Sequence, residues 1–151
     1  MNRTVAELFG TVFNIGKLPL APGTWSSFIA VLVWYIFFDE LNPFHFLLIN
    51  FILFFIGIIS AEIIIKNSND HDPSKIVIDE WVGQWISFLF LPVSITNAII
   101  GFILFRFFDI SKLKPISYME KIKGGWGIML DDILAGLMTL IILHLINIYF
   151  L

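Results

Sequence analysis

Five apolar segments alternate with polar stretches along this chain of 151 residues. They cover residues 25–38, 44–65, 80–91, 94–108 and 133–151. The second and the last are close to the ~20 residues that a membrane-spanning helix needs, and the other three are shorter. Prolines and polar residues separate the segments, so the pattern predicts two helical hairpins followed by one last helix.

A further helix is expected near the N-terminus, where apolar side chains recur at helical spacing. The stripe consists of Val5, Leu8, Phe9, Val12 and Phe13. Arg3 and Lys17 flank it. Such an amphipathic helix either lies in the membrane interface or packs on the core of its own protein, and the pattern favours neither arrangement.

The composition is that of a membrane protein. Hydrophobic residues make up 58% of the chain and charged residues 14%, whereas soluble domains have about 45–50% and about 25%. The mean hydropathy is +0.91. We therefore predict an all-α fold, a polytopic membrane helical bundle of about five hydrophobic helices plus the amphipathic N-terminal helix, in a single domain over residues 1–151. The net charge of -3 argues against nucleic acid as a partner, and the absence of cysteine excludes disulfides and thiolate metal sites.

The positive charges predict the topology. Because the two hairpins separate residues 1–24, 66–79 and 106–128, these three polar stretches should lie on one side of the membrane. They contain all nine Lys and Arg residues. The positive-inside rule makes this side cytoplasmic.

The same side gathers most of the acidic residues at the ends of apolar segments. These acids are Asp72, Asp79, Glu80, Asp109, Asp131 and Asp132. Adjacent carboxylates at the mouth of an apolar helix are costly unless a cation lies between them. Carboxylates without a chelating pair of imidazoles favour Mg²⁺, Mn²⁺ or Ca²⁺ over zinc. Nearby lysine and arginine suit a phosphate ester, so the residues indicate metal-dependent phosphoester chemistry on a membrane lipid.

Two smaller patterns bear on how the site is built. Residues 16–27 form a Pro/Gly loop that feeds a helix, with Thr24 or Ser26 as a plausible N-cap. Such a loop suits phosphate, although an ordinary turn and cap has the same pattern. Polar and small residues also recur on one face of segment 80–91. They are Glu80, Gly83, Gln84 and Ser87. We expect this face to point into the bundle, and expect Ala135 and Gly136 to let a neighbouring helix approach the acids closely.

Four blocks of sequence resemble the phosphatidylglycerophosphatase A family. They are Leu-Pro-Leu-Ala-Pro-Gly-Thr at 18–24, Asp72 with Ile-Val-Ile-Asp-Glu at 76–80, Phe-Arg-Phe-Phe-Asp at 105–109 with Lys112 and Pro115, and Gly-Gly-Trp-Gly-Ile-Met-Leu-Asp-Asp at 124–132 followed by Ala135 and Gly136. The resemblance implies a bacterial, Mg²⁺-dependent membrane enzyme that removes the terminal phosphate of phosphatidylglycerol phosphate. Where the family usually has Lys-Pro-Trp-Pro, this chain has Lys-Leu-Lys-Pro at 112–115.

The resulting hypothesis assigns a role to each polar residue of these blocks. The expected metal ligands are Asp79, Glu80, Asp109, Asp131 and Asp132, with Asp79 and Asp132 also counted as catalytic. The expected substrate-binding residues are Thr24, Arg106 and Lys112. Asp72 is the candidate for orienting or deprotonating the attacking water. The cofactor would be Mg²⁺, and the enzyme would be a multi-pass protein of the bacterial inner membrane with its site facing the cytoplasm.

Two other classes of function fit parts of the pattern. A small ion or proton transporter would use the acids as a relay, but it would need acids within the helices, and only Glu62 lies inside an apolar segment. Glu62 is also placed to form an ion pair with Lys66, four residues on. A membrane scaffold without enzymatic activity would tolerate replacement of the acids by alanine.

Overall fold

The computed structural model describes residues 1–66, 74–119 and 121–150, and these residues form an entirely helical fold. The helices are α1 (Arg3–Gly10), α2 (Pro22–Phe37), α3 (Pro43–Lys66), α4 (Ile78–Ile86), α5 (Ile95–Ser111), α6 (Ile116–Met119) and α7 (Gly125–Phe150), with a short 3-10 helix η1 (Ile15–Lys17). No strand occurs among the described residues. The predicted all-α class is confirmed.

The number of helices that could span a membrane is smaller than a bundle of five hydrophobic helices suggests. Among the described residues, only α3 and α7 are long and apolar enough to cross a bilayer, with 24 and 26 residues. Helices α2 and α5 have 16 and 17 residues. Helix α4 has only 9, because the chain leaves the α-helical conformation after Ile86 and passes through tight turns to a positive φ at Phe90. The apolar segment 80–91 is therefore longer than the regular helix that it contains.

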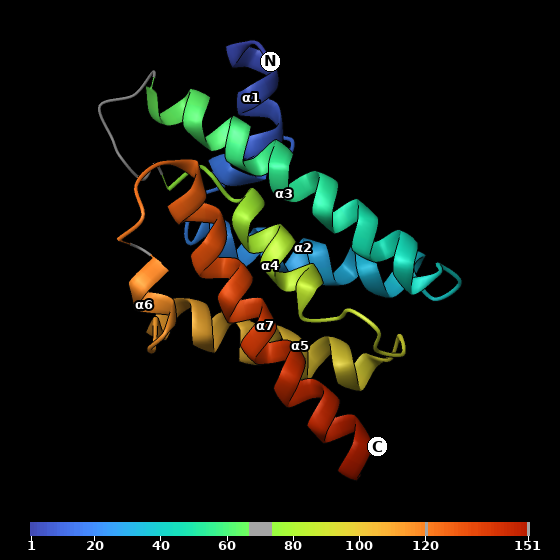
Figure 1. The fold of residues 1–151 in the computed structure, drawn as a ribbon. Helices are drawn as coiled ribbons and strands as arrows, with labels where there is room; N and C mark the ends of the chain where they lie inside the picture. The colour runs from blue at the N-terminus through green and yellow to red at the C-terminus, as the bar shows by residue number, and fades with distance from the viewer. Residues whose placement is uncertain (67–73, 120, 151) are drawn as a thin grey trace.

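The hairpins bring the polar ends of the helices together, as the topology argument predicted. In Figure 1, the end of α3, the end of α5 and the start of α7 lie on the left, whereas the turns between α2 and α3 and between α4 and α5 lie on the right with the C-terminus. Asp109 lies near the end of α5, Asp131 and Asp132 lie near the start of α7, and Asp79 and Glu80 lie at the start of α4. The acids therefore share one end of the bundle.

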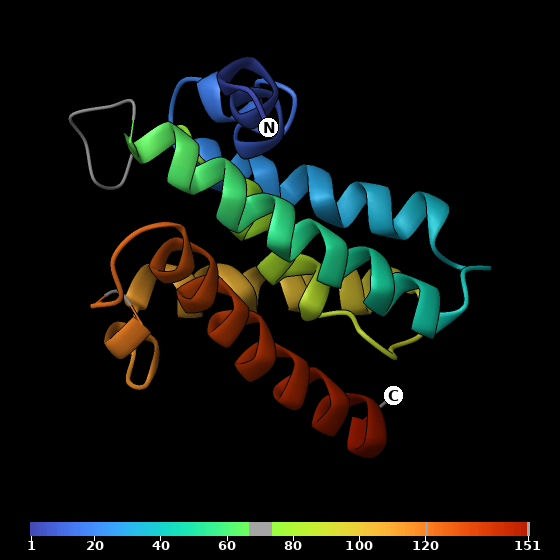
Figure 2. The same cartoon turned by 45° about the horizontal axis from the view of Figure 1, so that its top comes forward.

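Helix α4 is the centre of the bundle. It packs against α2, α3, α5 and α7, and Figure 2 shows it between α3 and α7. Gly83, Gln84 and Ser87 are buried, so the polar and small face of this helix points inward as predicted. Two of its contacts involve glycine: a Cβ on Gly83 would lie 2.6 Å from the backbone oxygen of Asp132, and one on Gly136 would lie 2.3 Å from the backbone oxygen of Gly83. The backbones of α4 and α7 are thus in contact next to Asp132.

The N-terminal helix packs on the core of its own protein, which is one of the two arrangements that the sequence left open. Helix α1 packs on α3, with Ala6 and Gly10 buried. The Val77 N–H donates a 2.9 Å hydrogen bond to the Gly10 carbonyl, which ties α1 to the segment that leads into α4. Val5 and Leu8 stay exposed on the outer face. This helix therefore packs on the core with one side and keeps an apolar side free.

Candidate active site

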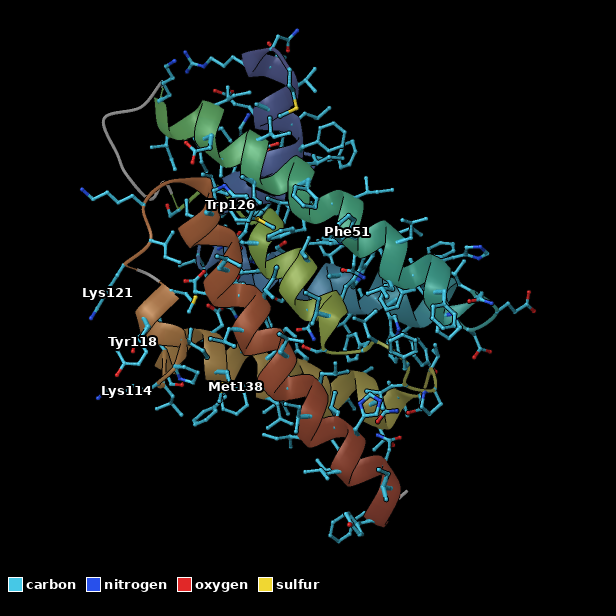
Figure 3. The ribbon with its side chains drawn as sticks, in the orientation of Figure 1. Phe51, Lys114, Tyr118, Lys121, Trp126 and Met138 are labelled. Atoms are coloured by element: carbon cyan, nitrogen blue, oxygen red, sulfur yellow. The ribbon has the colours of Figure 1, made fainter. Side chains whose placement is uncertain are left out.

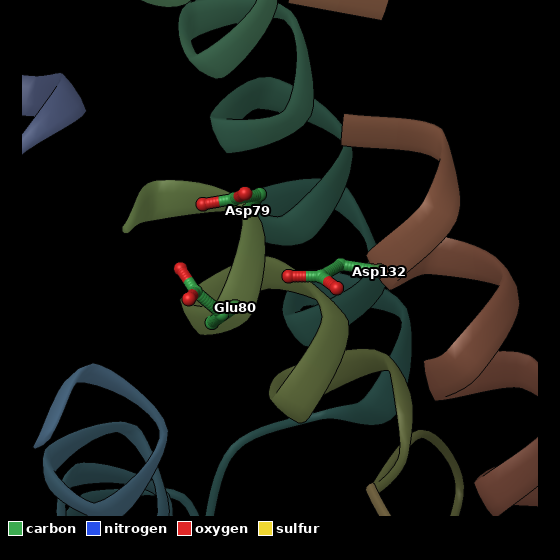
Figure 4. A group of neighbouring side chains, drawn as sticks. All are labelled: Asp79, Glu80 and Asp132. Carbon is green, nitrogen blue, oxygen red and sulfur yellow. The ribbon is translucent and has the colours of Figure 1, made fainter. Parts of the chain in front are cut away.

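Three carboxylates from two helices converge at the polar end of the bundle. Asp79 and Glu80 lie in the first turn of α4, and Asp132 lies in the second turn of α7. One carboxylate oxygen from each lies within 4.8 Å of the other two (Figure 4). Carboxylate oxygens grouped this closely are a donor set that could hold one divalent cation.

The electrostatics of the group are unfavourable without a cation. Asp79 Oδ1 and Glu80 Oε2 are buried and have no hydrogen-bond partner among the described residues. Burial, followed by the charge of Glu80, raises the pKa of Asp79 well above its ordinary value. Burial also raises the pKa of Glu80 to about 7, although Asp79 and Arg106 act in the opposite direction. A divalent cation would satisfy the unpartnered oxygens and offset the repulsion, so the residues fit an oxygen-coordinated metal such as Mg²⁺.

The other two acids each hold a basic side chain. The Arg106 guanidinium forms an ion pair with Asp109 on α5. The Lys112 ammonium lies 3.1 Å from Asp131 Oδ2 on α7. Asp109 and Asp131 are therefore neutralised by protein cations, whereas the Asp79–Glu80–Asp132 group is not paired in this way among the described residues.

These side chains surround one polar pocket of about 260 Å³. Its lining consists of Pro22, Gly23, Ser74, Ile76, Asp79, Glu80, Arg106, Asp109, Lys112, Ile128, Asp131 and Asp132. Arg106 also donates a 3.4 Å hydrogen bond from Nη1 to Ser27 Oγ on α2. Acids, bases and the first turn of α2 therefore meet in a single cavity.

The start of α2 comes very close to Glu80. Gly23 is buried, and a Cβ at this position would lie only 1.8 Å from Glu80 Oε1. Only glycine allows this approach. Thr24 is half-buried but does not line the pocket, whereas Pro22 and Gly23 do. The role of Thr24 in substrate binding stays a prediction.

Sequence analysis missed Gly23 and Ser27 as parts of the site. Gly23 belongs to the Pro-Gly-Thr block, but its contact with Glu80 joins residues far apart in the chain. Nothing in the sequence indicated that Ser27 belongs to the site, because a serine in an apolar helix most often forms a hydrogen bond to the backbone of its own helix. In the structure its hydroxyl does donate such a bond, to the Gly23 carbonyl. Asp72, the predicted water-activating residue, lies outside the described residues.

The fold and the pocket define a class: a strongly apolar helical protein with a polar pocket in which carboxylates and basic side chains meet. The sequence profile of the family described as phosphatidylglycerophosphatase A matches residues 8–147. The chain belongs to the phosphatidylglycerophosphatase A family.

Individual relatives agree with this family. A protein of Bacteroides thetaiotaomicron, provisionally named a phosphatidylinositol-3-phosphatase, is 38% identical over 143 residues, which cover 90% of this chain and 89% of that protein. Phosphatidylglycerophosphatase A of Haemophilus influenzae is 35% identical, with 93% of this chain and 88% of the relative covered. That of Escherichia coli is 34% identical, with 93% and 83% covered. No solved structure matches this chain.

Membership of this family makes the chain a phosphatase, that is, a phosphoric monoester hydrolase. The comparisons give no support to an ion or proton transporter. The named relatives differ in the lipid that their names contain, so the substrate of this chain has to be argued separately.

Proposed function

We propose that this chain is a Mg²⁺-dependent phosphatase that converts phosphatidylglycerol phosphate and water into phosphatidylglycerol and inorganic phosphate. The observation that supports it most is the unpaired Asp79–Glu80–Asp132 group, which shares a pocket with Arg106 and Lys112. Two relatives that are 34–35% identical bear the name of this activity. In this proposal, residues 1–151 form one domain.

In this proposal Asp79, Glu80 and Asp132 hold the metal ion. When bound, the ion supplies Lewis-acid stabilisation of the negative charge that develops on the phosphoryl oxygens. The buried, unpartnered oxygens of Asp79 and Glu80 are the donor atoms that support this assignment. Asp109 and Asp131, which sequence analysis also assigned as ligands, instead hold Arg106 and Lys112 in the pocket.

The basic residues bind the phosphate group of the lipid. Arg106 can offer two parallel donors to phosphate oxygens, and Lys112 adds a compact positive charge. Ser27 accepts a hydrogen bond from Arg106 and so orients its guanidinium. Water attacks the phosphorus, the bond from phosphorus to the lipid oxygen breaks, and the lipid alcohol leaves with a proton. Asp72 is our candidate for deprotonating the water.

The proposed location is the bacterial inner membrane, with several passes and the site at the cytoplasmic face. Helices α3 and α7 have the length and hydropathy of membrane spans. The site lies at the ends of these helices that adjoin the lysine-rich polar stretches. A lipid phosphate at the level of the head groups would thus reach the pocket while its acyl chains stay in the bilayer.

A direct test incubates the purified protein with phosphatidylglycerol phosphate and Mg²⁺, with and without EDTA. We expect phosphate release that EDTA abolishes and excess Mg²⁺ restores. Phosphatidylinositol 3-phosphate in a parallel reaction tests the activity named for the Bacteroides relative. Faster release from the inositol lipid would overturn the proposed substrate, and release that is insensitive to the chelator would overturn the proposed metal.

A further inference from the structure

A cluster of exposed lysines and apolar side chains projects beside the site. It consists of Lys114, Tyr118, Lys121, Ile122 and Lys123, which we call the basic edge. Figure 3 shows Lys114, Tyr118 and Lys121 together at the margin of the molecule, around α6. None of these residues lines the active-site pocket.

The basic edge has a fixed base. Ile116 of α6 is 1% exposed and packs with Phe105, Phe108 and Ala135, so α6 is anchored to α5 and α7. Tyr118, two residues on, is 48% exposed. The edge is thus held outward by the fold.

The lysines of this edge are available to an external anion. Among the described residues, Lys114, Lys121 and Lys123 form no ion pair with a carboxylate, in contrast to Lys112 nearby. The Lys121 ammonium lies 5.2 Å from the centre of the Tyr118 ring, an arrangement that keeps the cation beside an amphipathic aromatic group. Three cations at one edge stand out in a chain with a net charge of -3.

The apolar members identify the kind of partner. Tyr118 and Ile122 are exposed between the lysines, and Trp126 at the start of α7 is 46% exposed. Lysine heads together with aromatic and aliphatic side chains are typical of surfaces at the level of lipid head groups, where the cations meet phosphates and the apolar groups meet acyl chains. A soluble polyanion would match the lysines but not Tyr118 and Ile122.

We propose that the basic edge binds the head groups of anionic phospholipids and concentrates anionic lipid, the substrate included, at the mouth of the pocket. This inference rests on the proposed action on an anionic membrane lipid. Lys112 connects the two features, because it begins the segment that leads to the edge and itself lines the pocket. The edge acts on substrate supply and leaves the chemical step unchanged.

The test compares two variants that lose the same charge, each reconstituted in vesicles. The first is Lys114→Gln/Lys121→Gln/Lys123→Gln. The control is Arg3→Gln/Lys17→Gln/Lys66→Gln, which removes three exposed cations elsewhere. In phosphatidylcholine vesicles with a small fraction of phosphatidylglycerol phosphate, the first variant should show a KM raised about tenfold and kcat within about twofold of wild type. Raising the salt concentration should remove the difference in KM.

Two further measurements separate this inference from the proposed function. Turnover of a water-soluble, short-chain analogue of the same lipid should be equal in wild type and both variants. Tryptophan emission in wild type should be quenched more by brominated phosphatidylglycerol than by brominated phosphatidylcholine, because the exposed Trp126 follows Lys123 by three residues in the chain. The first variant should lose this preference, and the control should keep it.

The inference is overturned if the two variants have the same KM, or if the quenching preference survives in the first variant. Absence of phosphate release from any lipid, with the preference lost only in the first variant, would reject the proposed function and support lipid binding by the edge.

Discussion

Replacement of Gly23 by alanine should disable the site while the fold is retained. The new Cβ would lie 1.8 Å from Glu80 Oε1 and 2.7 Å from Glu80 Cδ. Real Cβ atoms essentially never come closer than 3.0 Å to another heavy atom, so the carboxylate would have to retreat by about 1.2 Å. The backbone of α4 cannot take up this shift, because Gly83 already touches the backbone of α7.

The expected effect follows from this displacement. A misplacement of about 1 Å in a catalytic constellation costs about 100-fold in rate, or about 2.7 kcal/mol in the activation free energy. Because Glu80 is a proposed metal ligand, the Mg²⁺ concentration for half-maximal activity should rise as well. The midpoint of thermal unfolding should fall only slightly, since the displaced group is a side chain at a pocket.

The assay measures initial rates of phosphate release over a Mg²⁺ titration, with thermal unfolding in the same detergent. Gly10→Ala is the matched control. Its Cβ would meet the Ile64 Cδ1 atom at 2.5 Å, which is the far end of a flexible side chain that does not line the pocket. We expect that variant to keep its activity within about threefold of wild type.

A double-mutant cycle with Glu80→Ala identifies the cause of the loss. Once the carboxylate is absent, Gly23→Ala has nothing to displace and should change the residual rate by less than about threefold. A further loss of about 100-fold in the Glu80→Ala background would refute the reasoning. So would full activity in Gly23→Ala alone.

Three other predictions follow from the site and the topology. Arg106→Lys keeps the charge but loses the paired donors, so phosphate release should weaken while the Mg²⁺ requirement stays the same; full activity would mean that Arg106 only balances its neighbouring acid. Since the pKa of Glu80 is raised to about 7, the free carboxyl takes up a proton as the pH falls through that value. Activity titrations should therefore require more Mg²⁺ at a pH of about 6 than at about 8, and a constant requirement would contradict Glu80 as a ligand. Cysteines at Lys75 and Lys121 should be labelled from the cytoplasm and one at Glu40 from outside; labelling of the first two from opposite sides would exclude a shared site.

The convergence of the acids was predictable because it depends on topology. Alternating apolar segments put Asp79 and Asp132 at the same end of the bundle, and the small residues beyond Asp132 indicated a close helix contact. The structure confirms that contact through Gly83 and Gly136.

Contacts between distant side chains and backbone were not predictable. Glu62 was expected to pair with Lys66, yet its Oε1 accepts a 2.8 Å hydrogen bond from the Gly125 N–H. That bond depends on how α3 crosses the start of α7. The approach of Gly23 to Glu80 depends in the same way on how α2 and α4 pack. Spacing along one helix carries no information about either crossing.

The most direct test of the account compares Asp132→Asn with Asp39→Asn. Both replace an acid next to an apolar segment, but Asp132 is buried in the pocket and Asp39 lies in the turn between α2 and α3, away from its lining. In Mg²⁺-dependent phosphate release from phosphatidylglycerol phosphate, Asp132→Asn should lower the rate at least about 100-fold, because a charged metal ligand is lost. Asp39→Asn should stay within about twofold of wild type. Equal, small effects of the two substitutions would contradict a metal site at Asp79, Glu80 and Asp132.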